Sequence, residues 1–239
     1  MKNIAPYTVS EPFPGLYVLD EGGVRCFLIP GKTEALLIDT GFGKGDLAAQ
    51  VREITALPVR VLHTHADGDH MGGDTAFEKI SLHPAEYDHF VINLRRFGKD
   101  EKPFLSRVSP VWEGEKLTYG AYTLEVVLIP GHTPGSIALL DREHRFLIGG
   151  DSIQTGEVWM FGPGRNMFAY AASMEKLCAM RDAFDTVLAS HVELCVGADM
   201  LPEIVEGAKA YLRGALQPEP FDGPADAKIY SYKRAKFLC

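Results

Sequence analysis

The sequence predicts a mixed α/β protein in which two sheets pack face to face with helices on their outer sides. Short apolar runs bounded by Gly or Pro alternate with segments of helical spacing along the chain. A group of strands followed by helices occurs twice, once in each half, without a low-complexity linker between them. A length of 239 residues suits a single domain, 1–239, with a large buried core.

The first half begins with apolar runs separated by turn residues, which predict three antiparallel strands over residues 16–19, 24–29 and 35–38. A helix is expected over 44–55, because Leu47, Val51 and Ile54 fall on one face. Pro58 ends this helix, and the apolar run 59–62 is the next strand.

A short strand over 80–82 and a helix from Pro84 to about Leu94 follow. Residues 90–112 then combine cationic and aromatic side chains without a clear period, and we expect them to form an inserted, lid-like segment. The second half repeats the pattern, with strands over 116–119, 123–129, 137–140, 146–148, 186–189 and 228–232 and helices over 174–184 and 200–216.

Composition excludes several classes of protein. Hydrophobic residues make up 46% of the chain and charged residues 23%, as in ordinary globular proteins, and the net charge of −8 argues against nucleic acid as a partner. The four cysteines are far apart and are predicted to be reduced thiols. No apolar run approaches the ~18 residues of a membrane span, and no export signal is evident. We therefore expect a cytoplasmic protein without a membrane partner.

The most informative stretch is residues 63–73, His-Thr-His-Ala-Asp-Gly-Asp-His-Met-Gly-Gly, directly after the strand over 59–62. Its imidazoles and carboxylates are ligand types that suit zinc, iron or manganese. Three more ligand-type residues follow apolar, strand-like runs: His132, Asp151 and His191. The repeated placement of such a residue after a strand predicts a metal site.

Together these residues resemble the metallo-β-lactamase superfamily, with motifs in the same order from Asp39 to His191. The turn Asp39-Thr40-Gly41 resembles an early motif of that family, and residues 64–73 resemble its first ligand motif. The resemblance implies a four-layer αββα sandwich with a binuclear metal site at one edge of the two sheets.

The first ligand motif departs from the family's usual form, His-x-His-x-Asp-His followed by x-Gly. In the alignment that we favour, the chain has His65-x-Asp67-x-Asp69-His70, so an aspartate replaces the second histidine. The alternative alignment uses His63 with His65 and Asp67 and leaves His70 out of step. In the favoured alignment, His63 is a hydrogen-bonding core histidine.

Carried over from the family, one metal ion would be held by His65, Asp67 and His132. The other would be held by Asp69, His70 and His191, and Asp151 would bridge the two. Asp39 would accept a hydrogen bond from the ring N–H of a ligand histidine or hold the turn in which it lies. The resemblance implies two divalent ions, with zinc as the first expectation and iron or manganese as alternatives because of the carboxylate at position 67.

A binuclear site of this kind lowers the pKa of a shared water towards about 7. Asp69 is the candidate catalytic residue, expected to orient this nucleophile and accept its proton. Arg165 and Trp159 are candidates for contact with a small substrate molecule, and Arg165 is expected to bind an anionic group of it. His83, His89 and His144 are interpreted as ordinary turn or helix residues.

The predicted function is hydrolysis of a small ester, thioester, lactone or related bond, as in stand-alone members similar to glyoxalase II. A phosphodiesterase or nuclease is one alternative, and a mononuclear iron oxygenase acting on sulfur is another, favoured by Asp67. A non-catalytic binding module of the same fold is a third alternative. The full set of ligand-type residues argues against it, because such a module would be expected to lose some of them. β-Lactam hydrolysis is a further alternative, but no export signal points to the periplasm, where that activity is useful. The sequence does not indicate an oligomeric state.

Overall fold

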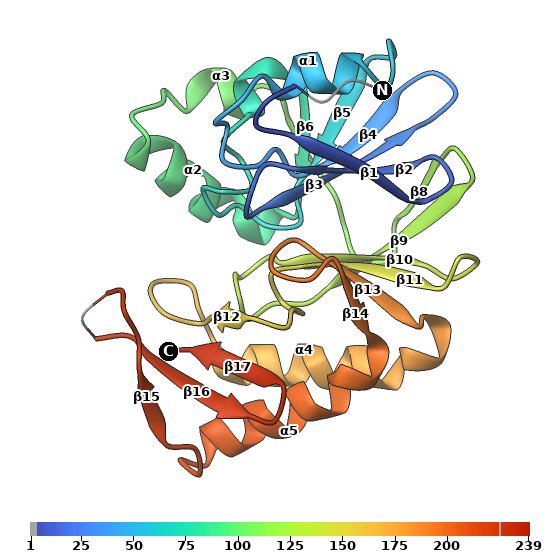
Figure 1. The fold of residues 1–239 in the computed structure, drawn as a ribbon. Helices are drawn as coiled ribbons and strands as arrows, with labels where there is room; N and C mark the ends of the chain where they lie inside the picture. The colour runs from blue at the N-terminus through green and yellow to red at the C-terminus, as the bar shows by residue number, and fades with distance from the viewer. Residues whose placement is uncertain (1–3, 225) are drawn as a thin grey trace. The chain divides into compact units, whose positions relative to one another are not determined.

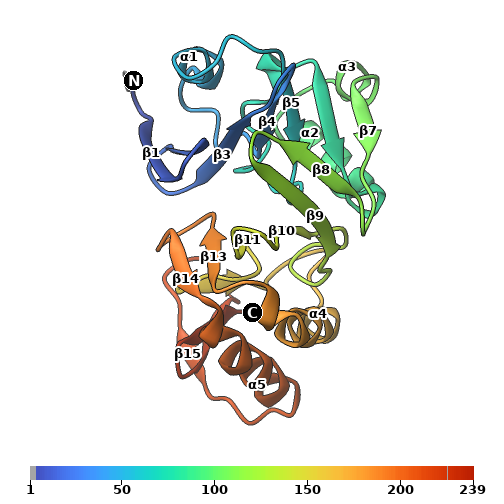
Figure 2. The ribbon, with the colours of Figure 1, turned by 90° about the vertical axis from the view of Figure 1, so that its right-hand side faces the viewer.

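The computed structural model describes residues 4–224 and 226–239, which divide into a first compact unit ending at Val126 and a second beginning at Val127. The first unit contains a seven-stranded sheet of order β1-β2-β3-β4-β5-β6-β7 (Figures 1 and 2). Its strands are β1 (Thr8–Phe13), β2 (Leu16–Asp20), β3 (Arg25–Pro30), β4 (Ala35–Ile38), β5 (Val59–Leu62), β6 (Lys79–Leu82) and β7 (Val108–Pro110). Neighbouring strands are antiparallel up to β4 and parallel from β4 to β7.

The change to parallel pairing at β4 positions the first group of ligands. Ile38 pairs with Leu62, so β4 and β5 end at the same edge and the segments that begin at Asp39 and His63 leave it together. The connection contains α1 (Leu47–Arg52), whose first turn is capped where the Asp46 side chain accepts a hydrogen bond from the Ala49 N–H at 2.8 Å.

Helices cover one face of this sheet. α2 (Tyr87–Arg96) continues from a 3₁₀ turn, η2 (Pro84–Glu86), and is followed by α3 (Lys102–Leu105). Alternate strand residues such as Leu28, Leu37 and Val61 share a core with Val51 of α1 and Phe90 of α2. The packing of α2 against the sheet fixes the helix next to the loop that follows β5.

The second sheet has the order β14-β13-β11-β10-β9-β8, and the chain passes from the first unit to the second within β9. Its strands are β8 (Lys116–Tyr119), β9 (Tyr122–Leu128), β10 (Ile137–Asp141), β11 (Phe146–Gly150), β13 (Thr186–Ala189) and β14 (Cys195–Gly197). The parallel strands β11 and β13 end together, with Gly150 paired to Ala189. Asp151 and His191 follow these ends.

Two helices complete the second unit, α4 (Met167–Ala179) and α5 (Leu201–Leu212), which lie beside each other in Figures 1 and 2. Met174 of α4 and Ile204 of α5 share a core with Leu147 and Val187 of the sheet.

A third sheet has the order β12-β17-β16-β15 and contains β12 (Glu157–Trp159), β15 (Pro218–Pro220), β16 (Lys228–Tyr232) and β17 (Ala235–Leu238). The remaining short elements are 3₁₀ turns: η1 (Asp74–Ala76), η3 (Arg181–Ala183) and η4 (Ala198–Met200).

The predicted strands over 35–38, 59–62, 116–119 and 186–189 have the observed bounds. The helix predicted over 174–184 is wrong in its bounds, because α4 begins at Met167, where the Asn166 side chain accepts a hydrogen bond from the Ala169 N–H at 3.0 Å. Within the segment predicted to be lid-like, residues 108–110 are β7.

In the part of the chain that the structure describes, no helix combines the length and apolar character needed to cross a membrane.

Gly43 allows the loop after β4 to approach the loop after β5. Its φ is +72°, and a Cβ at this position would lie 2.6 Å from the carbonyl oxygen of Gly72. We expect G43A to lower the free energy of unfolding, measured by urea denaturation, by about 1–3 kcal/mol more than G98A. Gly98 is the matched control, because its φ is +67° and a Cβ there would meet no atom within 4 Å. Equal losses in the two variants would show that the close approach does not matter.

Candidate metal centre

Ligand-type side chains lie in both units. His65, Asp67, Asp69 and His70 belong to the loop after β5 in the first unit, and His132, Asp151 and His191 belong to loops in the second. All of them fall in groups of His and Asp side chains of a composition that could hold a metal ion.

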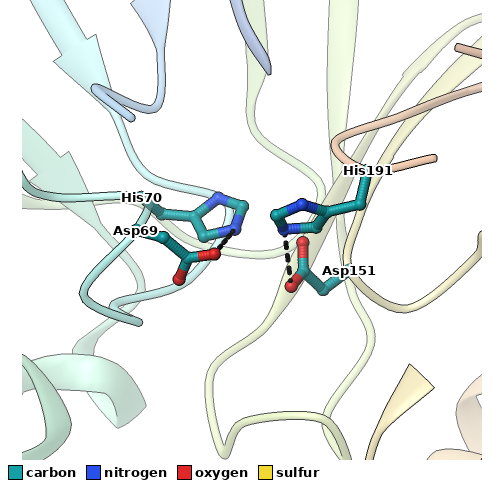
Figure 3. A group of neighbouring side chains, drawn as sticks. All are labelled: Asp69, His70, Asp151 and His191. Carbon is teal, nitrogen blue, oxygen red and sulfur yellow. Dashed lines mark ion pairs between the residues drawn. The ribbon is translucent and has the colours of Figure 1, made fainter. Parts of the chain in front are cut away.

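In the first unit, His65 and His70 each present Nε2 to a carboxylate. His65 Nε2 lies 3.6 Å from Asp67 Oδ2, and His70 Nε2 lies 3.8 Å from Asp69 Oδ2. The two imidazole rings have centroids 4.0 Å apart. Figure 3 shows the pair formed by Asp69 and His70. The loop after β5 therefore gathers nitrogen and oxygen donors of the type that divalent metals bind.

The other ring nitrogen of each histidine, Nδ1, contacts a protein oxygen. His70 Nδ1 lies 2.9 Å from Asp39 Oδ2, and His65 Nδ1 lies 3.0 Å from Thr64 Oγ1. A hydrogen bond at Nδ1 fixes the ring orientation and leaves Nε2 for a metal ion. The donor set of the first unit thus fits the divalent metal that the sequence predicts.

Asp39 is fully buried and fastens the end of β4 to the loop after β5. Its Oδ1 accepts a hydrogen bond from the Thr64 N–H at 2.8 Å, and its Oδ2 accepts one from the Thr64 hydroxyl at 2.7 Å. Burial alone would raise the pKa of the Asp39 carboxyl, but the imidazoles of His70 and His63 hold it well below its usual range. The carboxyl is therefore an ionised acceptor.

His63 lies between two buried carboxylates. Its Nε2 is 3.1 Å from Asp74, and its Nδ1 is 3.4 Å from Asp39 Oδ1. Burial opposes protonation of this ring, but the Asp74 and Asp39 carboxylates raise the pKa of His63 to about 9. With both nitrogens facing carboxylates of the core, His63 is placed to neutralise them.

Backbone contacts fix the two loops against each other. The Thr40 N–H donates to the His70 carbonyl at 2.7 Å, and the Gly72 N–H donates to the Gly41 carbonyl at 2.8 Å. The buried carboxylate of Glu21 accepts hydrogen bonds from the N–H groups of Phe42 and Lys44. These hydrogen bonds fix the backbone beside His70.

The second unit repeats the arrangement of a histidine beside a carboxylate. Asp151 Oδ2 lies 3.2 Å from His191 Nε2, the pair drawn in Figure 3, and 3.7 Å from His132 Nε2. His132 Nδ1 lies 2.9 Å from the Trp159 carbonyl oxygen. His132 therefore also has Nδ1 bound and Nε2 directed to a carboxylate, and this donor set fits a divalent metal as well.

The loop that carries His132 is rigidly packed. Gly131 has a φ of +140°, and a Cβ there would lie 2.3 Å from the Cα of Tyr170 in α4. The guanidinium of Arg165 donates to the His132 carbonyl at 2.7 Å. Arg165, the predicted substrate contact, is thus also a support for the His132 loop.

Trp159, the other predicted substrate contact, has 38% of its surface exposed, and its indole N–H donates to the Phe161 carbonyl at 2.9 Å. In the segment 90–112, expected to be lid-like, Phe97 and Trp112 are exposed, whereas Phe104 is buried in the core of the first unit. Near Trp159 in the sequence, Phe168 is exposed, and Met160 and Met167 are buried in the core of the second unit.

Sequence reasoning missed several side chains that hold the loop after β5. Glu86 and Asn93 bind the backbone of Ala66, and His89, interpreted as an ordinary helix residue, lies 2.6 Å from Asp67. The only signal for them in the sequence is their spacing of three and four residues, which places them on one helix face.

Comparison with known proteins shows the family of the chain. A model of the metallo-beta-lactamase superfamily matches residues 19–191. The chain is 30% identical over 216 residues to the acyl-coenzyme A thioesterase MBLAC2 of Gallus gallus, covering 76% of this chain and 77% of that protein. It is 31% identical over 119 residues to hydroxyacylglutathione hydrolase of Xanthomonas axonopodis pv. citri (strain 306), covering 50% and 42%.

The fold is also found in solved structures. A metallo-beta-lactamase from Pontibacter korlensis superposes with a TM-score of 0.67 at 17% identity, covering 85% of this chain and 99% of that one. The predicted fold class, a mixed α/β fold of the metallo-β-lactamase type, is confirmed. The chain belongs to the metallo-beta-lactamase superfamily and is a metal-binding hydrolase.

Proposed function

We propose that this hydrolase cleaves thioesters at a binuclear metal centre. One ion would be held by His65, Asp67 and His132, and the other by Asp69, His70 and His191, and Asp151 would be a ligand shared by both. The superfamily match supports this grouping, because residues 19–191 include all of these side chains. Zinc is the proposed metal, and the carboxylate at position 67 also suits iron or manganese.

The observation that carries the proposal is the orientation of the histidines. In His65, His70 and His132, Nδ1 is bound to a protein oxygen and Nε2 faces an aspartate. The core histidine His63 also faces carboxylates with both ring nitrogens, but the Asp74 carboxylate at its Nε2 is fully buried. The carboxylates that face Nε2 of His65, His70 and His132 are partly exposed, as a metal site requires.

A pair of divalent ions held by these residues would supply a water of lowered pKa and polarise the thioester carbonyl. Asp69 is the proposed proton acceptor. Its side chain is 29% exposed, compared with 17% for Asp67, so it is the more accessible of the two carboxylates in this loop. The carboxylate can hold the attacking water in line with the carbonyl carbon and take up its proton.

A thioester substrate is supported by two relatives, one named as an acyl-coenzyme A thioesterase and the other as a hydroxyacylglutathione hydrolase. Coenzyme A and glutathione both carry negative charge, which matches the expected anionic substrate. Trp159 and Arg165 are the proposed contacts for this part of the molecule.

Purified without added metal, the full chain is expected to contain two zinc ions by inductively coupled plasma mass spectrometry. It should release thiol from acyl-coenzyme A or acylglutathione in a spectrophotometric assay, with little hydrolysis of a phosphodiester. Metal-loaded protein active only on the phosphodiester would contradict thioester hydrolysis. A single iron would instead favour the oxygenase alternative.

D69N should lower kcat for thioester hydrolysis by about 10²–10⁴-fold, because the amide cannot accept the proton of the attacking water. The chain should still bind metal, since the amide oxygen stays available as a ligand. The control is D88N, which changes an exposed carboxylate on α2. Activity of D69N within a few fold of the unmodified chain would remove Asp69 from the catalytic role.

The metal contents of the variants D67A and H63A distinguish the favoured alignment of the ligand motif from the alternative that uses His63. D67A should lose one metal ion per chain, whereas H63A should retain both ions at saturating zinc and show a lower Tm, because it leaves the buried carboxylates of Asp39 and Asp74 without their cation. The reverse metal contents would favour the alignment that uses His63.

A further inference from the structure

One face of α2 is directed at the loop that carries the first ligands. Glu86, at the start of the helix, is followed by His89 three residues later and by Asn93 four residues after that. This spacing places the three side chains on the same side of the helix. Glu86 and Asn93 are buried, and His89 is 17% exposed at its side chain. We call these three residues the α2 cradle.

The α2 cradle holds the peptide before Asp67 at both of its polar groups. The Glu86 carboxylate accepts a hydrogen bond from the Ala66 N–H at 2.9 Å, and the Asn93 amide donates to the Ala66 carbonyl at 2.8 Å. Phe97, which directly follows α2, packs against Gly68, since a Cβ there would lie 2.3 Å from the Phe97 ring. The backbone on each side of Asp67 is thus fixed by α2 and the residue that follows it.

His89 binds the side chain of Asp67 itself. His89 Nε2 lies 2.6 Å from Asp67 Oδ1, whereas Asp67 Oδ2 is the oxygen that lies 3.6 Å from His65 Nε2. The two oxygens of one carboxylate therefore have different partners. The oxygen nearest to His65 is placed to share a metal ion with it, and the other is occupied by His89.

We propose that His89 is a positioning residue for the first metal site, donating a hydrogen bond to Asp67 Oδ1 so that Oδ2 is the ligating oxygen. The inference rests on the proposed function, in which Asp67 is a ligand. An aspartate has two equivalent oxygens on a rotatable carboxylate, and a partner that binds one of them selects the orientation of the other. Partners of this kind typically change metal affinity by about 10–100-fold when they are removed.

The test compares zinc retention in the full chain and its variants, purified with zinc and challenged with increasing dipicolinate. Zinc per chain is measured after gel filtration. H89A is expected to lose one of two ions at about 10–100-fold lower chelator concentration than the unmodified chain. H89Q should resemble the unmodified chain more than H89A, because the glutamine amide can donate to Oδ1 but is a poor metal ligand.

A matched control and a second background distinguish positioning from a general structural effect. H144A removes another His–Asp contact, with His144 Nδ1 3.0 Å from Asp141 Oδ1, and should leave zinc retention unchanged. In a D67H background, which removes the carboxylate, adding H89A should have little further effect on zinc retention, because the two residues act as one unit.

Equal zinc retention in H89A and the unmodified chain would overturn the inference while leaving the proposed function intact. An equal loss in H89A and H89Q, or an undiminished loss in the D67H background, would also overturn it, since His89 would then act independently of its hydrogen bond to Asp67. An unmodified chain that binds no zinc, iron or manganese would contradict the proposed function and, with it, this inference.

Discussion

The buried carboxylate of Asp39 is the contact on which the first group of ligands depends. It accepts hydrogen bonds from the Thr64 backbone and hydroxyl, and it binds Nδ1 of His70. Its backbone adopts a φ of +60°, a left-handed conformation that aspartate tolerates better than most residues. One ionised group thereby joins the end of β4 to the loop after β5 and selects the nitrogen that His70 presents.

Burying this carboxylate has an energetic cost that the surrounding residues offset. His63 stands between Asp39 and Asp74, and the Thr40 hydroxyl donates to Asp74 at 2.7 Å. A buried carboxylate is tolerated when it is paired and hydrogen-bonded. In the second unit the Trp159 carbonyl holds His132 in the same way, without a buried charge. The two units thus orient histidines by one principle with acceptors of different charge.

Much of the architecture follows from local patterns, and the rest depends on tertiary contacts. Ligand-type residues after apolar runs were predictable, because parallel strands such as β4 and β5 bring their ends to one edge. The roles of Glu86, His89 and Asn93 were not, since their positions depend on how α2 packs against the sheet. The departure at Asp67 was evident in the sequence, whereas its partner, 22 residues further on, required the structure. Short edge strands such as β1 and β7 carry too weak a period to be recognised.

Histidines held at Nδ1 are expected to bind metal through Nε2. The decisive measurement uses crystals of the protein purified without added metal, with anomalous data collected at the zinc, iron and manganese edges. We expect two anomalous peaks, one within ligand distance of His65 Nε2 and Asp67 Oδ2 and the other within ligand distance of His70 Nε2 and Asp69. A peak at His63, ligation through Nδ1 of His65 or His70, or the absence of a peak under conditions that preserve bound metal would contradict it.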